Sequence, residues 1–113
     1  MTEPMDKIFK RISLLSKNDN KNVLEKCIKI QEEVGELSAE LLKLRGKKGS
    51  NGLKIPELKE NILEECCDVI IITFSLMQAL KYTQPRIETA FHRKLDKVAI
   101  NHKKQKLWKK QIS

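Results

Sequence analysis

The sequence predicts an all-α protein, and three observations lead to that prediction. Apolar residues recur at helical spacing over long segments, only four glycines and three prolines interrupt the chain, and acidic residues are grouped at helical intervals. We expect a four-helix bundle whose core is completed by oligomerisation, because 113 residues with 4% aromatic residues build only a small core. We treat residues 1–113 as one domain, with its core at about 22–104 and a basic C-terminal tail at 105–113.

The first two predicted helices are separated by a short polar segment. The first helix covers about residues 4–16, and the segment 17–22 ends it and offers capping side chains for the second helix, at about 22–45. The first helix has four apolar residues on one side: Ile8, Phe9, Ile12 and Leu15. The second helix has an apolar seam with a 3.5-residue repeat: Val23, Cys27, Ile30, Val34, Leu37, Leu41 and Leu44. Such a seam is typical of a helix packed lengthwise on a partner.

The third predicted helix covers about residues 56–82 and follows a loop rich in Gly and Lys at 46–55, where Gly46 is expected to end the second helix. Pro56 suits the first turn of the third helix. The run Val-Ile-Ile-Ile-Thr-Phe at 69–74 favours a β-strand when it is taken alone. Because neither Gly nor Pro interrupts the segment, and acids at helical spacing lead into the run, we predict a helix that is apolar on nearly all sides.

The fourth predicted helix carries most of the net charge. It covers about residues 84–104, with Thr83 as its cap and Pro85 near its start, and the final residues are expected to fray. The formal net charge is +8, and residues 86–113 hold nine Lys or Arg against two acids. A near-neutral body with a basic end suits a polyanionic partner, either nucleic acid or a nucleoside triphosphate.

The sequence indicates a soluble, cytoplasmic protein. Its N-terminus lacks an apolar stretch of signal-peptide type, and the longest apolar run, at 69–80, is shorter than the roughly 20 residues that span a bilayer. The three cysteines, Cys27, Cys66 and Cys67, are an odd number and include an adjacent pair. We therefore expect small buried thiols in a reducing compartment, not a disulfide framework.

Two acidic clusters are the main candidates for a functional site. Glu33 and Glu36 share a face of the second helix, with Glu40 one turn on, and Glu65 and Asp68 share a face of the third. Like charges at these spacings repel, and carboxylates beside an apolar seam also lose hydration. A bound hard cation offsets both costs, and ligation by oxygen alone points to Mg²⁺, with Mn²⁺ as a substitute. The alternative is a pair of solvated acidic faces.

The segments EEVGE at 32–36 and ECCD at 65–68 resemble the EExxE…ExxD signature of MazG-type all-α NTP pyrophosphatases. That superfamily includes dCTP pyrophosphatases and dimeric dUTPases. The resemblance covers about residues 22–100. It implies that four carboxylates bind the metal: Glu33, Glu36, Glu65 and Asp68. Glu32 fills the first place of the signature and is the catalytic candidate, although Glu64 could equally accept a proton during hydrolysis.

The same resemblance implies hydrolysis of an NTP or dNTP to the monophosphate and pyrophosphate by a homodimer or homotetramer. The basic tail motif of the family maps loosely onto Lys94, Lys97 and Asn101, which we expect to contact substrate phosphates. For the two lysines the alternative is a solvated basic face. The competing function is a basic helical module that binds nucleic acid or a protein partner without catalysis. Because the sequence contains neither a zinc-finger nor an RNP motif, we expect no specific nucleic-acid recognition.

Overall fold

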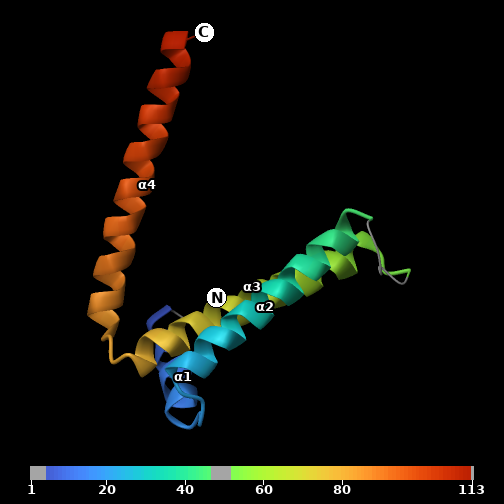
Figure 1. The fold of residues 1–113 in the computed structure, drawn as a ribbon, viewed down its shortest axis with the longest axis vertical. Coiled ribbons are helices and arrows are strands. Elements are labelled where there is room, and N and C mark those ends of the chain that lie inside the picture. Colours follow the sequence, from blue (N-terminus) through green and yellow to red (C-terminus); the bar gives the residue numbers. More distant parts are fainter. Residues whose placement is uncertain (1–4, 47–51, 113) are drawn as a thin grey trace. The chain divides into compact units, whose positions relative to one another are not determined.

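The computed structural model describes residues 5–46 and 52–112, and the regular structure within these ranges is helical throughout (Figure 1). The chain forms four helices in order: α1 (Met5–Lys17), α2 (Val23–Leu44), α3 (Ile55–Ala79) and α4 (Gln84–Ile112). No strand occurs in the described ranges, so the predicted all-α class is confirmed. None of the helices there is both long and apolar enough to cross a membrane.

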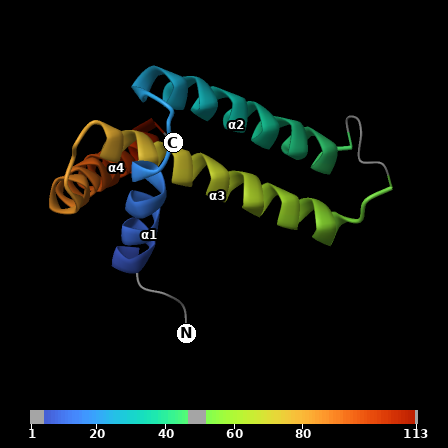
Figure 2. The same ribbon diagram turned by 90° about the horizontal axis from the view of Figure 1, so that it is seen from below.

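The chain divides into two compact units, Met1–Lys81 and Tyr82–Ser113. The first unit contains α1, α2 and α3, and the second contains α4. Within the first unit, α2 and α3 run antiparallel and side by side along their lengths, and α1 packs against α3 (Figure 2). The candidate carboxylates of the two acidic clusters all lie on the α2–α3 pair.

The start and the end of α2 follow from local chemistry that the sequence predicted. The side chain of Asn22 accepts a hydrogen bond from the Glu25 N–H at 2.8 Å, and the Glu25 carboxylate accepts one from the Asn22 N–H at 3.5 Å. This reciprocal pair is a capping box and satisfies two N–H groups at the start of the helix. At the other end, Gly46 adopts a φ of +72° and donates its N–H to the carbonyl of Lys43 at 2.9 Å. That left-handed conformation is one that glycine reaches without strain.

Aromatic packing joins α1 to α3. The rings of Phe9 and Phe74 lie with their centroids 4.6 Å apart, and both side chains are buried together with Ile12. The side-chain amide of Gln78 also donates to the carbonyl of Phe9 at 3.3 Å. The predicted inward face of the first helix is thus confirmed at Phe9 and Ile12, whereas Leu15 is exposed.

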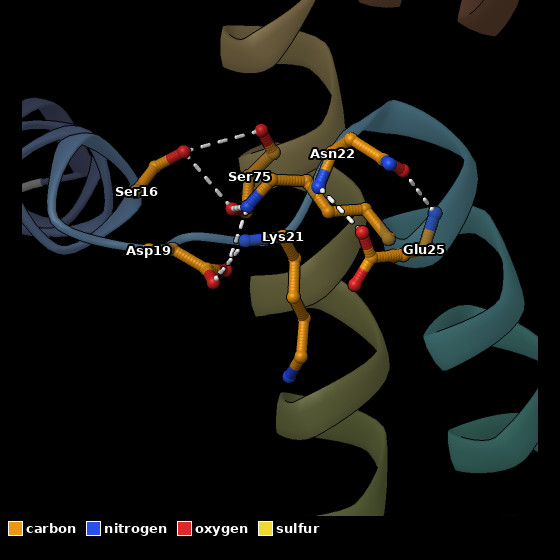
Figure 3. Close-up of polar contacts among 7 residues, drawn as sticks. Ser16, Asp19, Lys21, Asn22, Glu25 and Ser75 are labelled. Atoms are coloured by element: carbon orange, nitrogen blue, oxygen red, sulfur yellow. Dashed lines mark hydrogen bonds and ion pairs between the residues drawn. The ribbon is translucent and has the colours of Figure 1, made fainter.

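A buried polar network joins the α1–α2 connection to α3 (Figure 3). Lys26 is 1% exposed, and its Nζ donates to Asp19 Oδ2 at 2.7 Å and to Ser75 Oγ at 2.8 Å. The Ser75 hydroxyl in turn lies 3.0 Å from that of Ser16 on α1. A buried ammonium needs a charged partner and further hydrogen bonds, and this network supplies both.

The inward face of α2 differs from the predicted apolar seam. The buried residues of α2 are Lys26 and Glu33, whereas Val34 and Leu41 of the seam are exposed. The face of α2 that packs on α3 is therefore rotated away from the centre of the seam. The rotation brings charged side chains to the α2–α3 contact and leaves part of the apolar stripe on the surface of the chain.

The structure corrects two helix ends. The third helix ends at Ala79 and not at about residue 82, because Lys81 adopts a left-handed φ of 69° that breaks the helical path. The fourth begins as predicted, with the Thr83 hydroxyl accepting from the Arg86 N–H at 3.4 Å. It continues to Ile112, well beyond the predicted end at residue 104, since the segment contains neither Gly nor Pro after its first turn and is rich in Lys and Gln.

The expectation that the cysteines are buried is also corrected. Cys27 and Cys67 are exposed in this chain, and Cys66 is half-buried. Cys27 lies on the exposed side of α2, next to the buried Lys26, and Cys67 neighbours Cys66 on α3. Neighbours on a helix point about 100° apart, so the adjacent pair cannot share one environment.

Candidate metal centre

Three carboxylates from two helices meet at the α2–α3 contact. Glu33 and Glu36 lie three residues apart on α2 and share a face, and Glu65 faces them from α3. One carboxylate oxygen from each residue lies within 4.8 Å of the other two. The antiparallel pairing therefore assembles a three-carboxylate cluster, Glu33, Glu36 and Glu65, from segments about 30 residues apart in the sequence.

Glu33 is the most deeply buried member of the three-carboxylate cluster. It is 9% exposed, and its Oε1 accepts an ion-pair contact from Lys29 Nζ at 3.2 Å. Its other oxygen, Oε2, is buried and has no hydrogen-bond partner. Glu65 likewise buries an Oε2 without a hydrogen bond, whereas Glu36 is exposed. Glu40, one turn beyond Glu36 on α2, also buries an Oε2 without a hydrogen bond, but it lies outside the cluster. Buried polar atoms are nearly always paired, so the two oxygens of Glu33 and Glu65, which lie in the cluster, are candidates for contact with a ligand.

The electrostatics of the cluster show what it costs to hold these carboxylates together. Burial raises the pKa of Glu65 above its usual value, and the nearby carboxylates of Glu36, Asp68 and Glu33 raise this pKa further. Both effects disfavour the ionised form, because a buried charge loses hydration and like charges repel. A cation bound among these oxygens would remove the repulsion.

The three-carboxylate cluster fits a small divalent cation. Mg²⁺ binds oxygen at about 2.0–2.1 Å, so two oxygens on opposite sides of one ion lie about 4.2 Å apart. Of three oxygens on one octahedral ion at most one pair is opposite and the other pairs lie about 3.0 Å apart, so oxygens up to 4.8 Å apart would have to close by up to about 1.8 Å for all three to bind directly. Side-chain torsions accommodate a movement of this size. Carboxylate oxygens are also the ligands that Mg²⁺ and Mn²⁺ prefer.

Two other predicted site residues lie beside the cluster but outside it. Asp68 follows Glu65 by about one turn of α3 and is exposed, and it is close enough to raise the pKa of Glu65. Glu32 is also exposed, and its Oε2 lies 3.4 Å from Lys29 Nζ. Glu64, the alternative proton acceptor, is exposed on α3.

The three predicted phosphate-binding residues belong to the second unit. Lys94, Lys97 and Asn101 all lie on α4, and all three are exposed. Lys94 and Lys97 are three residues apart and so share a face of this helix.

The sequence reasoning missed the lysines that accompany the acids of α2. Lys29 pairs with Glu32 and Glu33, and the pKa of Lys29 is raised, first by its hydrogen bond to Glu33 and then by that to Glu32. Lys43 pairs with Glu40, with its Nζ 2.9 Å from Oε1. The spacing of i, i+3 and i, i+4 between these residues was a readable signal, because side chains at those intervals meet on a helix.

Comparisons with known proteins found no match to this chain. No protein-family model matches the sequence, and neither a curated protein nor a solved structure matches it.

Proposed function

We propose that the chain is a metal-dependent nucleoside triphosphate pyrophosphohydrolase of MazG type, which converts an NTP or dNTP to the monophosphate and pyrophosphate. One observation carries this proposal. Carboxylates of Glu33, Glu36 and Glu65 meet within 4.8 Å at the α2–α3 contact, and Glu33 buries an oxygen without a partner. These residues occupy three of the four positions that the resembled signature implies as metal ligands.

The residues of the cluster take distinct parts in this reaction. Glu33, Glu36 and Glu65 would hold Mg²⁺, and Asp68, exposed on the same helix as Glu65, would be a fourth ligand. When bound, the ion supplies positive charge for the phosphate oxygens and lowers the pKa of water. Without it, these carboxylates repel a triphosphate, so the reaction should depend strictly on a divalent cation.

Residues outside the cluster would handle the proton and the outer phosphates. The carboxylate of Glu32 is exposed and ionisable, which suits a proton acceptor for the attacking water. Lys94 and Lys97 offer two ammonium groups on one face of α4, and Asn101 offers an amide one turn beyond Lys97. Ammonium groups form strong, charge-assisted hydrogen bonds with phosphate oxygens.

We further propose that the enzyme is a homo-oligomer, either a dimer or a tetramer. The support is apolar surface that the single chain leaves exposed on its two long paired helices, including Val34 and Leu41 on α2 and Leu63 and Ile70 on α3. Burial of apolar surface contributes about 25 cal/mol per Å². A two-fold interface would bury the same surfaces of both copies.

The decisive experiment measures pyrophosphate release from a panel of NTPs and dNTPs with Mg²⁺. Wild-type protein should hydrolyse at least one nucleotide, and chelation by EDTA should abolish the activity. Glu36→Gln and Asp68→Asn each remove one negative ligand and preserve side-chain shape, so activity should fall by at least about a hundredfold with the helical circular-dichroism spectrum intact.

Glu60→Gln is the matched control for these variants. Glu60 is exposed on α3 and lies outside the three-carboxylate cluster, so the same change of charge there should leave turnover near that of the wild type. Near-wild-type turnover of Glu36→Gln in Mg²⁺ would exclude the carboxylate site. Selective binding of DNA or RNA without hydrolysis of any nucleotide would instead favour the nucleic-acid-binding function.

A further inference from the structure

Lys29 links two neighbouring carboxylates of α2. Its Nζ lies 3.2 Å from Glu33 Oε1 and 3.4 Å from Glu32 Oε2. The three side chains differ in exposure, because that of Glu32 is 58% exposed, that of Lys29 34% and that of Glu33 11%. The series Glu32–Lys29–Glu33 therefore runs from solvent to the buried edge of the three-carboxylate cluster.

The two carboxylate oxygens of Glu33 differ in their contacts. Oε1 is engaged by Lys29, and Oε2 is buried without a hydrogen bond. A contact to one oxygen restricts the rotation of the carboxylate plane, and the other oxygen stays available at the cluster. Carboxylates that bind metals are commonly held in this way by an outer hydrogen-bonding partner.

We infer that Lys29 is a positioning residue for the metal ligand Glu33, and that Glu32 anchors Lys29 in that role. The inference rests on the metal site proposed above. It assigns to Lys29 a contribution to metal affinity that is made through Glu33 and not through contact with the ion.

Charge and geometry give opposite expectations for Lys29, which makes the inference testable. An ammonium near a cation repels it, so removal of Lys29 would tighten metal binding if charge alone mattered. Glu32, however, lies 3.4 Å from the same ammonium and offsets its charge. With the repulsion reduced, the geometric effect should dominate, and removal of Lys29 should weaken metal binding.

The test is calorimetric titration of Mn²⁺ into the metal-free protein without nucleotide. Lys29→Gln should weaken Mn²⁺ binding by about tenfold or more, the range typical of lost outer partners of metal ligands. Lys29→Arg keeps a positively charged donor for Glu33, which the neutral amide of Gln does not, and should keep the affinity within about threefold of the wild type. Lys43→Gln is the matched control, because Lys43 pairs with Glu40 outside the cluster, and it should shift the affinity by less than about twofold.

The possible outcomes separate this inference from the proposed function. Unchanged or tighter Mn²⁺ binding by Lys29→Gln, with normal binding by the wild type, overturns the positioning role and leaves the metal site intact. An equal loss in Lys43→Gln also overturns it, because the effect is then one of general charge. Failure of the wild-type protein to bind Mn²⁺ removes the metal site itself and the inference with it.

Discussion

Replacement of Glu33 by Gln should make the metal-free protein more stable and the metal-saturated protein less stable than the wild type. Without metal, Glu33 places a carboxylate side chain that is only 11% exposed beside two other carboxylates. Gln keeps the Oε1 that accepts from Lys29, and its amide N–H groups can donate to the carboxylate of Glu36 or Glu65. With metal, the same substitution removes a negative ligand.

The structure sets the size of both effects. A buried polar atom without a partner costs about 1–3 kcal/mol, and Glu33 Oε2 is such an atom. Partial recovery of that cost, together with relief of the repulsion from Glu36 at i+3, should raise the free energy of unfolding by about 1 kcal/mol. For a chain of this size, that corresponds to about 4 °C in Tm. Metal at a hundred times its Kd should stabilise the wild type by about 2.7 kcal/mol, or about 11 °C.

The assay is thermal unfolding followed by circular dichroism at one fixed protein concentration, in EDTA and in saturating Mg²⁺. The two Tm values should change order, with Glu33→Gln higher in EDTA and the wild type higher in Mg²⁺. Glu60→Gln is the control, because Glu60 is exposed on α3 and lies outside the three-carboxylate cluster, and it should keep the response to Mg²⁺. An equal rise in Tm with Mg²⁺ for Glu33→Gln and wild type would refute the reasoning.

Three further predictions concern pH, the buried lysine and assembly. Because the pKa of Glu65 is raised in the folded state, the stability that this group contributes without metal is present at low pH and is lost as pH rises through the raised pKa. Mn²⁺ affinity should rise over the same window, by up to about tenfold per pH unit, and titrations at several pH values should show a flatter profile for Glu65→Gln. Lys26→Ala should lower the free energy of unfolding by about 2–4 kcal/mol in urea denaturation, whereas the exposed neighbour change Lys21→Ala should cost less than about 0.5 kcal/mol. Light scattering of the wild type should give at least twice the chain mass of 13.1 kDa, and Leu41→Asp should dissociate or unfold it; a folded, active species of one chain mass would contradict the oligomer.

Local sequence signals were sufficient to predict the helices. The segment 69–74 is helical despite its β-prone composition, because helical pattern and the absence of Gly and Pro over a long stretch outweigh the propensity of six residues. The cap at Asn22 and the stop at Gly46 follow from side-chain and backbone chemistry within a few residues. The end of α3 was missed because a non-glycine residue, Lys81, takes the left-handed conformation.

The candidate site could be predicted only in part. The helical spacing of Glu33 and Glu36 indicated a shared face, but their approach to Glu65 depends on how α2 is rotated against α3. That rotation places Lys26 and Glu33 inside and part of the apolar seam outside, and no pattern within one helix determines it. Asp68 was grouped with the other predicted ligands by its motif, but in the structure it is exposed and lies outside the three-carboxylate cluster.

The Lys26–Ser75 contact has a consequence for how α2 and α3 align along their length. Hydrogen bonds are directional and short, so a polar contact between two helices is sensitive to a shift of one helix along the other. A shift of one residue along the axis moves α2 by about 1.5 Å, which would break the 2.8 Å contact between Lys26 and Ser75. Glu33 follows Lys26 by seven residues, about two turns, so the same shift would displace it by about 1.5 Å relative to Glu65. The buried ammonium of Lys26 thus contributes to the longitudinal register on which the meeting of the distant carboxylates depends.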